Sequence, residues 1–340
     1  MNPSVLIVGA GALGLVTGYH LALAGAQVTY LVRPNRMAAL ADPQLLYCYD
    51  DHQLKSFADY RACASVEDAT QSEHDFVIVT MDGATCRGEE ATALLRDLGH
   101  AIRTTNAIAV ISGVGVLDYC KDVLGLPSDR VMEGTMGILA YQCDRTKMPI
   151  IPPTDAGKLS QASLAYRHVG KNPGFMAIKP PKRSARAFAE LYNQCGVSRC
   201  AVMDAKLFAT FASSIFVTMA MFDLAGWPDA ATLARDEELM TLGARATKEV
   251  MRLSRHGVAG KLGSLLVSAK SLARTNAKME RDCLPVDYSA FNAFHHGGKV
   301  RQQDLAYLQA CLNAGTREGR AMPALTELVR RYEAKISADD

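Results

Sequence analysis

The stretch VLIVGAGALGLVTGYHLALAGAQVTYLVRPNR, from Val5 to Arg36, decides the fold of this chain. It begins with a short apolar run that is typical of a buried parallel strand, and the glycine-rich turn GAGALG follows directly. Apolar residues then recur at helical spacing over residues 12–24, and a second strand is expected over residues 26–32. A strand, a helix and a strand within about 30 residues predict a βαβ unit.

The glycine-rich turn has the spacing G-x-G-x-x-G. Gly9 permits a tight turn, Gly11 lets the backbone approach a pyrophosphate, and Gly14 allows the helix to pack closely on the strand. The free N–H groups at the start of the helix favour phosphate binding. Because the turn follows a strand and opens a helix, the sequence predicts a dinucleotide site. The residues expected there are Gly9, Ala10, Gly11, Ala12, Leu13 and Gly14.

The residue after the second strand indicates which dinucleotide is bound. A site that prefers NAD would place an acidic residue there for the ribose hydroxyls, whereas Arg33 suits a 2′-phosphate. The alternative is that Arg33 and Arg36 are simply two solvated loop arginines. We therefore expect NADP(H) as the cofactor.

The composition limits the number of domains and the kinds of partner that this chain can have. The 340 residues suggest roughly two domains, and 49% hydrophobic with 21% charged residues is ordinary globular usage. A net charge of +2 does not favour nucleic acid or a membrane as a partner. Nine scattered cysteines without a C-x-x-C pair predict reduced thiols. With no secretion signal and no long uninterrupted apolar run, we expect a soluble, cytoplasmic protein.

The pattern of elements changes near the middle of the chain. Apolar runs at residues 76–82 and 107–115, a helix at 88–102 and another strand within 130–142 predict a doubly wound α/β sheet. From about Ser184 the pattern is helical. We expect a Rossmann domain over residues 1–183 and an all-α substrate and dimerisation domain over 184–340. The expected helices of the latter are residues 185–195, 204–224, 232–256, 261–274, 302–314 and 324–335.

The chain resembles the ketopantoate reductase (2-dehydropantoate 2-reductase) family of NADPH-dependent enzymes that reduce 2-oxo acids. The resemblance rests on GAGALG with Arg33, on the strand ends VTMD and ISGVG, and on the segments MEGTMGILA and GRAMPALTELV. It implies a Rossmann domain followed by an all-α domain (6-phosphogluconate-dehydrogenase-like), an active site in the cleft between them, and a homodimer. It also implies that Arg33 binds the 2′-phosphate and that the backbone at Ala140 lies near the nicotinamide.

Two strand ends depart from the family pattern. Ser112 stands where the family usually has asparagine, and Asp82 stands where a lysine is common. The acidic residue that usually precedes the penultimate helix is matched either by Gln302 or by the nearby Asp287. We expect Ser112 and Gln302 to contact the cofactor.

The larger departure lies in the family's catalytic helix, W-x-K-x-x-x-N-x-x-x-N. The best local match, FATFASSIFVT, places Thr210 on the lysine and Ser214 and Thr218 on the asparagines. These three lie on one helical face and could hydrogen-bond a substrate, but threonine is a poor acid. A shifted register instead places Lys206 on the lysine. Both registers remain open.

The stretch FNAFHHGGKV, residues 291–300, precedes a predicted helix and has no counterpart in the family motif. Lys299 supplies a positive charge for a carboxylate, and His295 or His296 could donate a proton near neutral pH. A surface loop with a solvated lysine is the alternative. Side chains of adjacent histidines diverge, so we expect no metal site.

These features predict an NADP(H)-dependent oxidoreductase that transfers a hydride between the nicotinamide and a small 2-oxo or 2-hydroxy acid, or a related carbonyl compound. The candidate catalytic residues are Lys299, His296, Lys206 and Thr210, and the candidate substrate-binding residues are Ser214 and Thr218. Because the lysine position is changed, a non-catalytic NADP-binding sensor or structural protein is the alternative. The expected partners are a small carboxylate substrate and a second copy of the chain.

Overall fold

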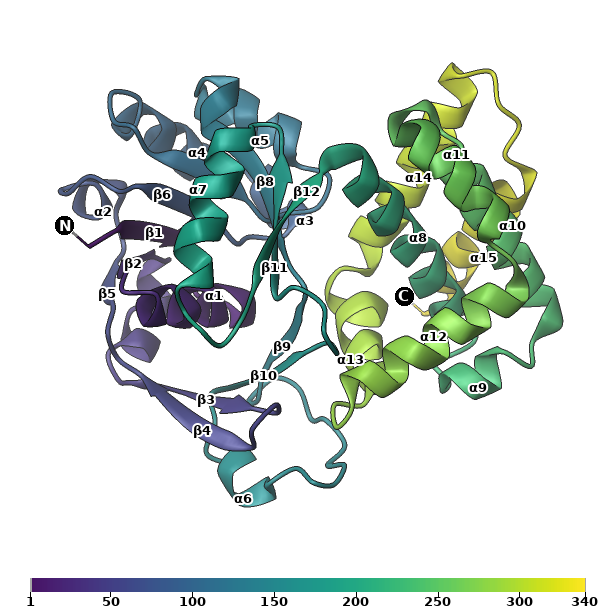
Figure 1. The fold of residues 1–340 in the computed structure, drawn as a ribbon, viewed down its shortest axis with the longest axis horizontal. Helices are drawn as coiled ribbons and strands as arrows, with labels where there is room; N and C mark the ends of the chain where they lie inside the picture. The colour runs from purple at the N-terminus through teal and green to yellow at the C-terminus, as the bar shows by residue number, and fades with distance from the viewer. Residues whose placement is uncertain (1, 340) are drawn as a thin grey trace. The chain divides into compact units, whose positions relative to one another are not determined.

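The computed structural model describes residues 2–339, which divide into two compact units between Met203 and Asp204 (Figure 1). This division falls later than the expected boundary at residue 183. The reason is that α7 (Lys182–Asn193) packs on the sheet of the first unit, where Phe188 and Tyr192 are fully buried. The helix expected at residues 185–195 therefore belongs to the first unit and not to the second.

The first unit is built on an eight-stranded sheet in the order β12-β11-β8-β7-β6-β1-β2-β5. The six strands from β8 to β5 are parallel, and β11 runs antiparallel to β8. The bounds are β1 (Ser4–Val8), β2 (Gln27–Leu31), β5 (Arg61–Cys63), β6 (Phe76–Val79), β7 (Ile108–Ile111), β8 (Val131–Met136), β11 (Phe175–Lys179) and β12 (Cys200–Asp204). The prediction of a parallel α/β sheet followed by a helical region is confirmed.

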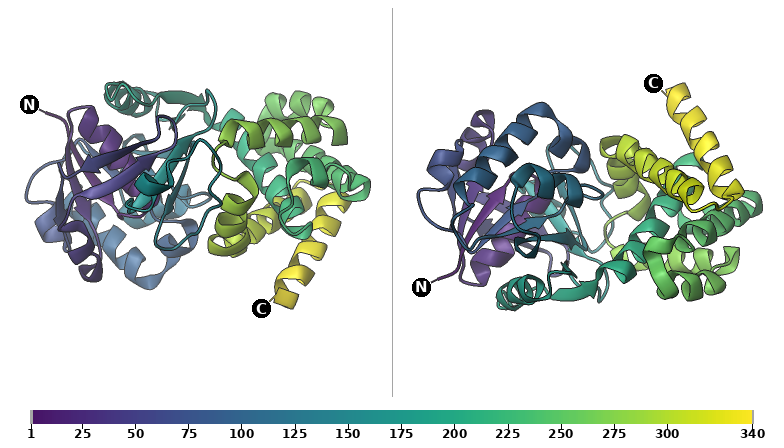
Figure 2. Two further views of the ribbon diagram at one scale, coloured as in Figure 1. Left: turned by 90° about the horizontal axis from the view of Figure 1, so that it is seen from below. Right: turned by 90° about the horizontal axis from the view of Figure 1, so that it is seen from above.

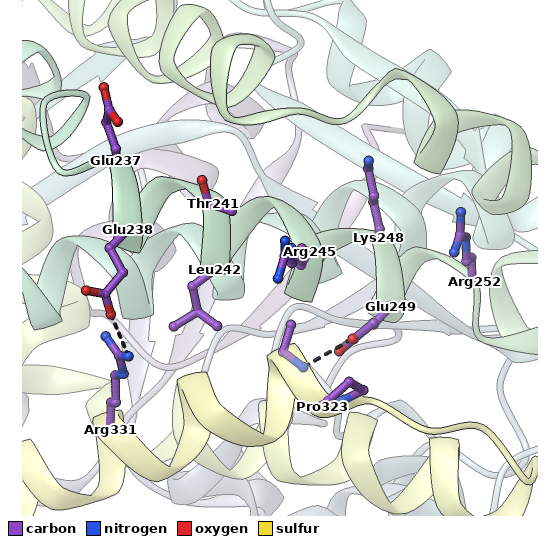
Figure 3. A pocket seen from close by; sticks show the side chains of 11 residues that line it. Glu237, Glu238, Thr241, Leu242, Arg245, Lys248, Glu249, Arg252, Pro323 and Arg331 are labelled. Atoms are coloured by element: carbon purple, nitrogen blue, oxygen red, sulfur yellow. Dashed lines mark hydrogen bonds and ion pairs between the residues drawn. The ribbon is translucent and has the colours of Figure 1, made fainter.

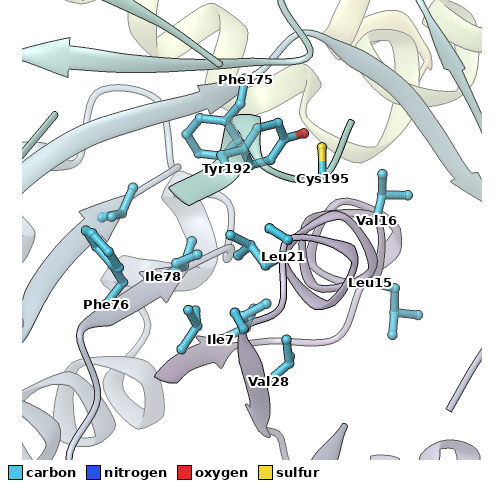
Figure 4. Close-up of a cluster of buried hydrophobic side chains, with 14 of the residues drawn as sticks. Ile7, Leu15, Val16, Leu21, Val28, Phe76, Ile78, Phe175, Tyr192 and Cys195 are labelled. Atoms are coloured by element: carbon cyan, nitrogen blue, oxygen red, sulfur yellow. The ribbon is translucent and has the colours of Figure 1, made fainter. Parts of the chain in front are cut away.

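Helices cover both faces of this sheet. On one face, α1 (Ala12–Leu23) and α7 bury Leu15, Leu21 and Tyr192 in a single apolar core (Figure 4). On the other face, α4 (Glu89–Ala101) and α5 (Leu117–Leu124) bury a second core. The shorter helices of this unit are α2 (Val66–Ala69), α3 (Gly83–Arg87) and α6 (Ala156–Leu159). Because helices cover both faces of the sheet, its strands are continuous apolar runs and do not alternate between apolar and polar residues.

A second, four-stranded sheet in the first unit was not predicted. Its order is β4-β3-β10-β9, formed by β3 (Gln44–Cys48), β4 (Gln53–Phe57), β9 (Ile138–Gln142) and β10 (Leu164–His168). The single strand expected within residues 130–142 is two strands, β8 and β9, which join different sheets. The chain breaks at Gly137, where a Cβ atom would lie only 2.5 Å from the carbonyl oxygen of Pro173.

From Ala205 onward the described elements are helical (Figure 2). They are α8 (Ala205–Leu224), α9 (Ala230–Leu233), α10 (Glu237–Met251), α11 (Gly257–Leu266), α12 (Ala269–Cys283), α13 (Tyr288–Phe294), α14 (Arg301–Arg317) and α15 (Pro323–Asp339), with a π-helix over His295–Lys299. The helix expected over 261–274 is broken at Ser268, whose side chain starts α12 in a capping box with Ser271. The alternative of a surface loop at residues 291–300 is wrong, because α13 and the π-helix cover residues 288–299.

Among the described residues, α8 is the one helix long and apolar enough to cross a membrane by length and composition. Of its most apolar window, 61% is buried within the protein. Its last turn carries the buried Asp223, whose Oδ1 lies 2.7 Å from the guanidinium of Arg301. A mostly buried helix with an ion pair to a neighbouring helix is what the core of a helical unit contains, so packing explains most of the apolar residues of α8.

Candidate active site

The glycine-rich turn between β1 and α1 adopts the conformation that its spacing predicts. Gly9 has φ +102°, a left-handed conformation that favours glycine. A Cβ atom on Gly14 would lie 2.4 Å from the carbonyl oxygen of Gly9, so helix and turn meet closely only because this residue has no side chain. The Thr80 hydroxyl after β6 donates to the carbonyl oxygens of Val8 and Gly9, at 3.0 and 3.2 Å. No local sequence pattern predicted this role of Thr80.

The first turn of α1 is open to a ligand. Its first intrahelical hydrogen bond runs from the Leu15 amide to the Gly11 carbonyl, at 2.9 Å, so the preceding amides have no helical acceptor. Gly11 is exposed, and no atom lies within 4 Å of the place where its Cβ would be. Unpaired amides at the positive end of a helix, without a side chain in front of them, fit a pyrophosphate.

Two further residues of the first unit have unsatisfied polar groups. Arg33, directly after the buried end of β2, is exposed, and its guanidinium has no hydrogen bond or ion pair among residues 2–339. Ser112, directly after β7, has a buried hydroxyl that lacks a partner in the same residues. Ser112 fits a role in ligand binding because a protein rarely leaves a buried hydroxyl unpaired, and the exposed guanidinium of Arg33 is available to pair with an anion.

The other predicted residues of this unit have structural surroundings. Asp82 caps the N-terminus of α3, where its Oδ1 accepts from the Thr85 amide at 2.8 Å. Its place in the sequence is explained by this cap. Ala140 lies in β9 of the smaller sheet, opposite Tyr166 of β10, and is partly buried.

In the second unit, the hydroxyl face predicted on α8 is present, but two of its three hydroxyl groups, those of Thr210 and Ser214, bond the helix itself. Thr210 Oγ1 donates to the Lys206 carbonyl at 2.8 Å, and Ser214 Oγ donates to the Thr210 carbonyl at 3.1 Å. Thr210 and Thr218 are buried. These hydroxyls can still accept a hydrogen bond, but a proton already directed at a backbone carbonyl is not available to a substrate. Lys206 at the start of α8 is exposed.

The π-helix after α13 holds a histidine–carboxylate pair. Nδ1 of His296 lies 2.6 Å from Oδ2 of Asp304, a fully buried residue in the first turn of α14. Burial raises the pKa of Asp304, although the hydrogen bond and charge of His296 oppose that rise. Because a carboxylate only accepts, it places a proton on Nδ1, and Nε2 has no partner among the described residues. The sequence suggested His296 but not its partner Asp304.

The neighbouring His295 is a different kind of group. Burial, together with the charges of His296 and Lys299, lowers its pKa to about 3. Its ring stacks on Phe291 of α13. His295 is therefore a neutral packing residue at neutral pH, whereas His296 is paired with a carboxylate. Lys299, at the end of the π-helix, is exposed and has no ion pair in the described residues.

The shape of the π-helix depends on one close contact. A Cβ on Gly297 would lie 2.6 Å from Nε1 of Trp227, so the indole packs directly on the glycine backbone. Trp227 itself has φ +60°, which is unusual for a residue other than glycine. Backbone strain and π-helical turns both concentrate at functional sites, because the surrounding structure must maintain them.

Buried charges fix the start of the adjacent helix. Arg301, the first residue of α14, pairs with Asp223 and with Asp339, each at 2.7 Å. The same Asp223 lies 3.8 Å from Nζ of Lys335. This network holds the turn that carries Asp304. Gln302, predicted to contact the cofactor, lies on this turn and is exposed.

A surface groove of about 700 Å³ lies between α10 and α15 (Figure 3). Arg331 crosses it to Glu238 at 2.7 Å, and Glu249 accepts from the Ala324 and Leu325 amides at the start of α15. None of the predicted site residues lines this groove. Among residues 2–339 there is also no group of three His, Cys, Asp or Glu side chains that could hold a metal ion.

Comparison with known proteins relates the chain to one family of reductases. Residues 5–148 match the family model described as ketopantoate reductase PanE/ApbA. No curated protein matches the chain. Solved structures share its fold over nearly the whole length.

Three of these structures illustrate the likeness. The 2-dehydropantoate 2-reductase of Methylococcus capsulatus is 17% identical, with a TM-score of 0.66 over 97% of this chain and 96% of that one. The enzyme of the same name from Geobacter metallireducens is 18% identical, with a TM-score of 0.61 over 97% and 99%. D-mandelate dehydrogenase, solved with NADH and anilino(oxo)acetate, is 12% identical, with a TM-score of 0.65 over 98% of both chains.

At such low identities the solved structures establish the shared fold, while the family model identifies the N-terminal region. That match covers residues 5–148, so the N-terminal region is similar to the ketopantoate reductase PanE/ApbA family, and the whole chain shares the fold of the solved 2-dehydropantoate 2-reductases.

Proposed function

We propose that the protein is an NADP(H)-dependent oxidoreductase that interconverts a small 2-oxo acid and its 2-hydroxy acid. The observation that carries the proposal is the His296–Asp304 pair, which provides an oriented proton donor on a chain that also has an open dinucleotide turn. The related structures, 2-dehydropantoate 2-reductases and a D-mandelate dehydrogenase solved with NADH and anilino(oxo)acetate, support the reaction class.

The first unit would bind the cofactor. The amides of Gly11 and its neighbours would hold the pyrophosphate, Arg33 would pair with a 2′-phosphate, and the free hydroxyl of Ser112 would contact the bound nucleotide. When bound, the reduced nicotinamide supplies the hydride. The choice of NADP(H) over NAD(H) rests on the charge of Arg33 and on the lack of an acidic residue at its position.

His296 would deliver the proton. As the carbonyl oxygen of a 2-oxo acid gains negative charge, protonated His296 gives it the Nε2 proton and becomes neutral. Asp304 holds the ring through Nδ1 and stabilises the charged form of the imidazole, so that the proton is available at the outer nitrogen. In the oxidative direction the neutral ring accepts the proton from the 2-hydroxyl group.

Lys299 would select the carboxylate. Its ammonium group is exposed, unpaired among the described residues and three positions from His296 along the π-helix. A 2-oxo acid carries its carboxylate next to the reacting carbonyl, so one cation and one proton donor in neighbouring positions suit that arrangement. The α8 residues Ser214 and Thr218 would contact the substrate as hydrogen-bond acceptors. Lys206, also exposed, is the alternative proton donor.

A substrate screen tests this proposal. Purified protein with NADPH is supplied with 2-oxo acids that differ in side-chain size, and in reverse with NADP⁺ and the matching 2-hydroxy acids, while absorbance at the nicotinamide band is followed. Turnover of at least one acid, with simple ketones of the same size much slower, is expected. NADPH binding without turnover of any compound would instead favour a non-catalytic sensor or structural protein.

We also infer that a second copy covers one face of the helical unit. Leu207, Phe211 and Ile215 on α8 and four apolar residues of α11 are 40–80% exposed, and the two helices pack together. Seven exposed apolar side chains on two packed helices are unusual for a surface in contact with water, and they suit an interface with a second copy of the chain. The apolar residues of α11 are Val258, Leu262, Leu265 and Leu266.

A cytoplasmic location is part of the same proposal. All nine cysteines are free thiols, and eight of them are buried. Reduced thiols and a supply of NADPH are both typical of the cytoplasm.

A further inference from the structure

A second cluster of reactive side chains lies in the first unit, apart from the glycine-rich turn. His168, at the end of β10, lies between Ser198 and Asp50: its Nε2 is 2.9 Å from Ser198 Oγ, and its Nδ1 is 2.5 Å from Asp50 Oδ2. Arg167 pairs with the other oxygen of Asp50. A hydroxyl, an imidazole and a carboxylate in this order form the arrangement that activates a serine.

The hydrogen bonds of this cluster have only one consistent direction when the histidines are neutral. Asp50 is an acceptor, so it places the proton of His168 on Nδ1 and leaves Nε2 to accept from the Ser198 hydroxyl. The hydrogen bond and charge of His168 and Arg167 lower the pKa of Asp50 although burial opposes them, so this residue is a carboxylate. His168 therefore serves as a base toward Ser198.

Two buried residues support the serine from behind. Tyr192 donates to Ser198 Oγ at 3.2 Å and in turn bonds Nδ1 of His20 at 2.7 Å. Burial and the charge of His168 lower the pKa of His20 to about 3, so it is neutral, and its ring stacks parallel to His168 with centroids 5.6 Å apart. The hydroxyl of Ser198 thus lies between its acceptor, Nε2 of His168, and a donor, the hydroxyl of Tyr192.

The serine can also be reached. His168 and Asp50 have side chains that are 17% and 27% exposed, and Ser198 is half-buried. A Cβ on Gly174 would lie 2.1 Å from Ser198 Oγ, so the backbone of Gly174 packs against one side of the hydroxyl and only a glycine fits there. The amides of Val197, Ser198 and Arg199 have no hydrogen-bond acceptor among residues 2–339. Unpaired amides next to a nucleophile can stabilise a developing oxyanion.

We propose that Ser198 is an activated nucleophile that hydrolyses small esters, with His168 as its general base and Asp50 as a positioning residue. This activity would be separate from the dehydrogenase reaction and needs no cofactor. Only small acyl groups would fit, because Tyr192 and His20 fill the space behind the hydroxyl.

The proposed reaction balances in two steps. Ser198 Oγ forms a bond to the carbonyl carbon while His168 Nε2 takes its proton; the ester C–O bond breaks, and His168 gives the proton to the departing alcohol. Water then loses a proton to His168 and attacks the acyl carbon, the acyl–serine bond breaks, and Ser198 regains the proton as the carboxylic acid leaves.

A fluorophosphonate probe and p-nitrophenyl acetate test the proposal on the full-length protein. We expect the probe to modify Ser198 of the unmodified sequence, as located by peptide mass, and Ser198→Ala to lose both labelling and ester hydrolysis. His168→Gln should lower hydrolysis at least about 100-fold. The matched control is Ser160→Ala, an exposed serine whose hydroxyl bonds the Gly157 carbonyl and which should behave as the parent protein.

Two results would overturn the proposal. One is the absence of probe on Ser198 at a concentration that fully labels a known serine hydrolase. The other is unchanged hydrolysis in Ser198→Ala that retains the circular dichroism spectrum and Tm of the parent. Because labelling is read on the unsubstituted protein, the test holds even if the variants fold poorly. Neither readout uses NADPH, so it is independent of the dehydrogenase activity.

Discussion

At the residue scale, a single carboxylate distinguishes the two adjacent histidines of the π-helix. His296 bonds the buried Asp304, whereas His295 is packed on Phe291 with its pKa lowered to about 3. Proton transfer near neutral pH needs a group that can gain and lose its proton there, which His295 cannot do. Of the two histidines, the structure therefore favours His296 as the proposed proton donor.

Substitution of His296 provides the most direct test of the proton donor. His296→Gln should lower kcat about 10²–10⁴-fold with the substrate identified in the screen, because general acid catalysis typically contributes that much. NADPH affinity, measured by fluorescence titration, should stay the same. His295→Gln is the matched control and should keep kcat within about threefold; equal losses in both variants would assign the effect to folding of the segment.

Asp304 should act through His296 and not on the substrate. Asp304→Asn keeps the shape of the side chain but can donate to Nδ1, which favours the wrong tautomer. We expect kcat to fall at least about tenfold and the pH profile of kcat to move, with KM little changed. A variant with a lower Tm but an unchanged kcat and pH profile would indicate that the Asp304 carboxylate has a purely structural role.

Arg33 should determine cofactor choice. Arg33→Ala removes a charge-assisted hydrogen bond, worth about 1.5–3 kcal/mol, and should weaken NADPH binding roughly 10- to 100-fold while leaving NADH binding nearly unchanged. Binding is read from the quenching of protein fluorescence or by calorimetry. Arg36→Ala is the control, since Arg36 is the other arginine of this loop. Equal weakening of both cofactors would exclude a specific 2′-phosphate contact.

At the scale of elements, the π-helix over His295–Lys299 is stabilised by the side chain of Trp227, which packs on it. The two glycines of HHGGK differ in surroundings: a Cβ on Gly297 would meet Trp227 Nε1 at 2.6 Å, whereas the nearest atom to a Cβ on Gly298 is 3.9 Å away. The strained backbone of Trp227, with φ +60°, is maintained by stacking of its indole on Phe222. The segment is therefore one packed unit, and not the solvated loop that its composition suggested.

This difference predicts opposite outcomes for two adjacent substitutions. Gly297→Ala should destabilise the protein by about 1–3 kcal/mol, because the indole or the π-helix must move, and it should lower kcat by displacing His296. Gly298→Ala, the matched control, should leave stability within about 0.5 kcal/mol. Urea unfolding followed by circular dichroism measures both. Similar stabilities of the two variants would show that Trp227 does not constrain the segment.

At the scale of the whole molecule, each unit buries histidines that the unfolded chain would protonate. Burial lowers the pKa of His20 in the first unit to about 3, and in the second unit the pKa of His256 falls to about 4 and that of His295 to about 3. Glu133 on β8 acts in the opposite direction, because burial raises its pKa to about 7. The three lowered histidine pKa values together have a larger effect on the pH dependence of stability than the one raised carboxylate pKa.

The direction in which stability changes with pH follows from the number of protons that the folded and the unfolded chain bind. Between their unfolded pKa near 6.5 and their folded values, the histidines bind protons only when the chain unfolds, so stability is complete above pH 6.5 and falls as the pH drops toward 4. The urea midpoint should decrease over that range, and His20→Gln should make the decrease shallower. His100→Gln, an exposed histidine on α4, is the control. A midpoint that does not depend on pH between 7 and 4 would contradict this account.

The sequence alone determined the βαβ unit, the glycine turn and the change from an α/β to a helical unit. These depend on local patterns: apolar runs set the buried strands, and Gly9 and Gly14 are required within a few residues of each other. The helix of residues 185–195 was predicted correctly as a helix, but it was assigned to the wrong unit. Its apolar face fits either unit, and only the fold shows Phe188 and Tyr192 packed on the sheet.

Only the tertiary structure decided which side chains meet. The strands β3 and β10 are far apart in the chain, and so are His168, Ser198 and Asp50, so no local pattern could join them. Asp304 pairs with His296 eight positions earlier because a π-helix turns the chain there, and helical spacing would not place the two together. Local periodicity determines the elements, whereas pairing across elements depends on packing, which is why the glycine turn was predictable and the partner of His296 was not.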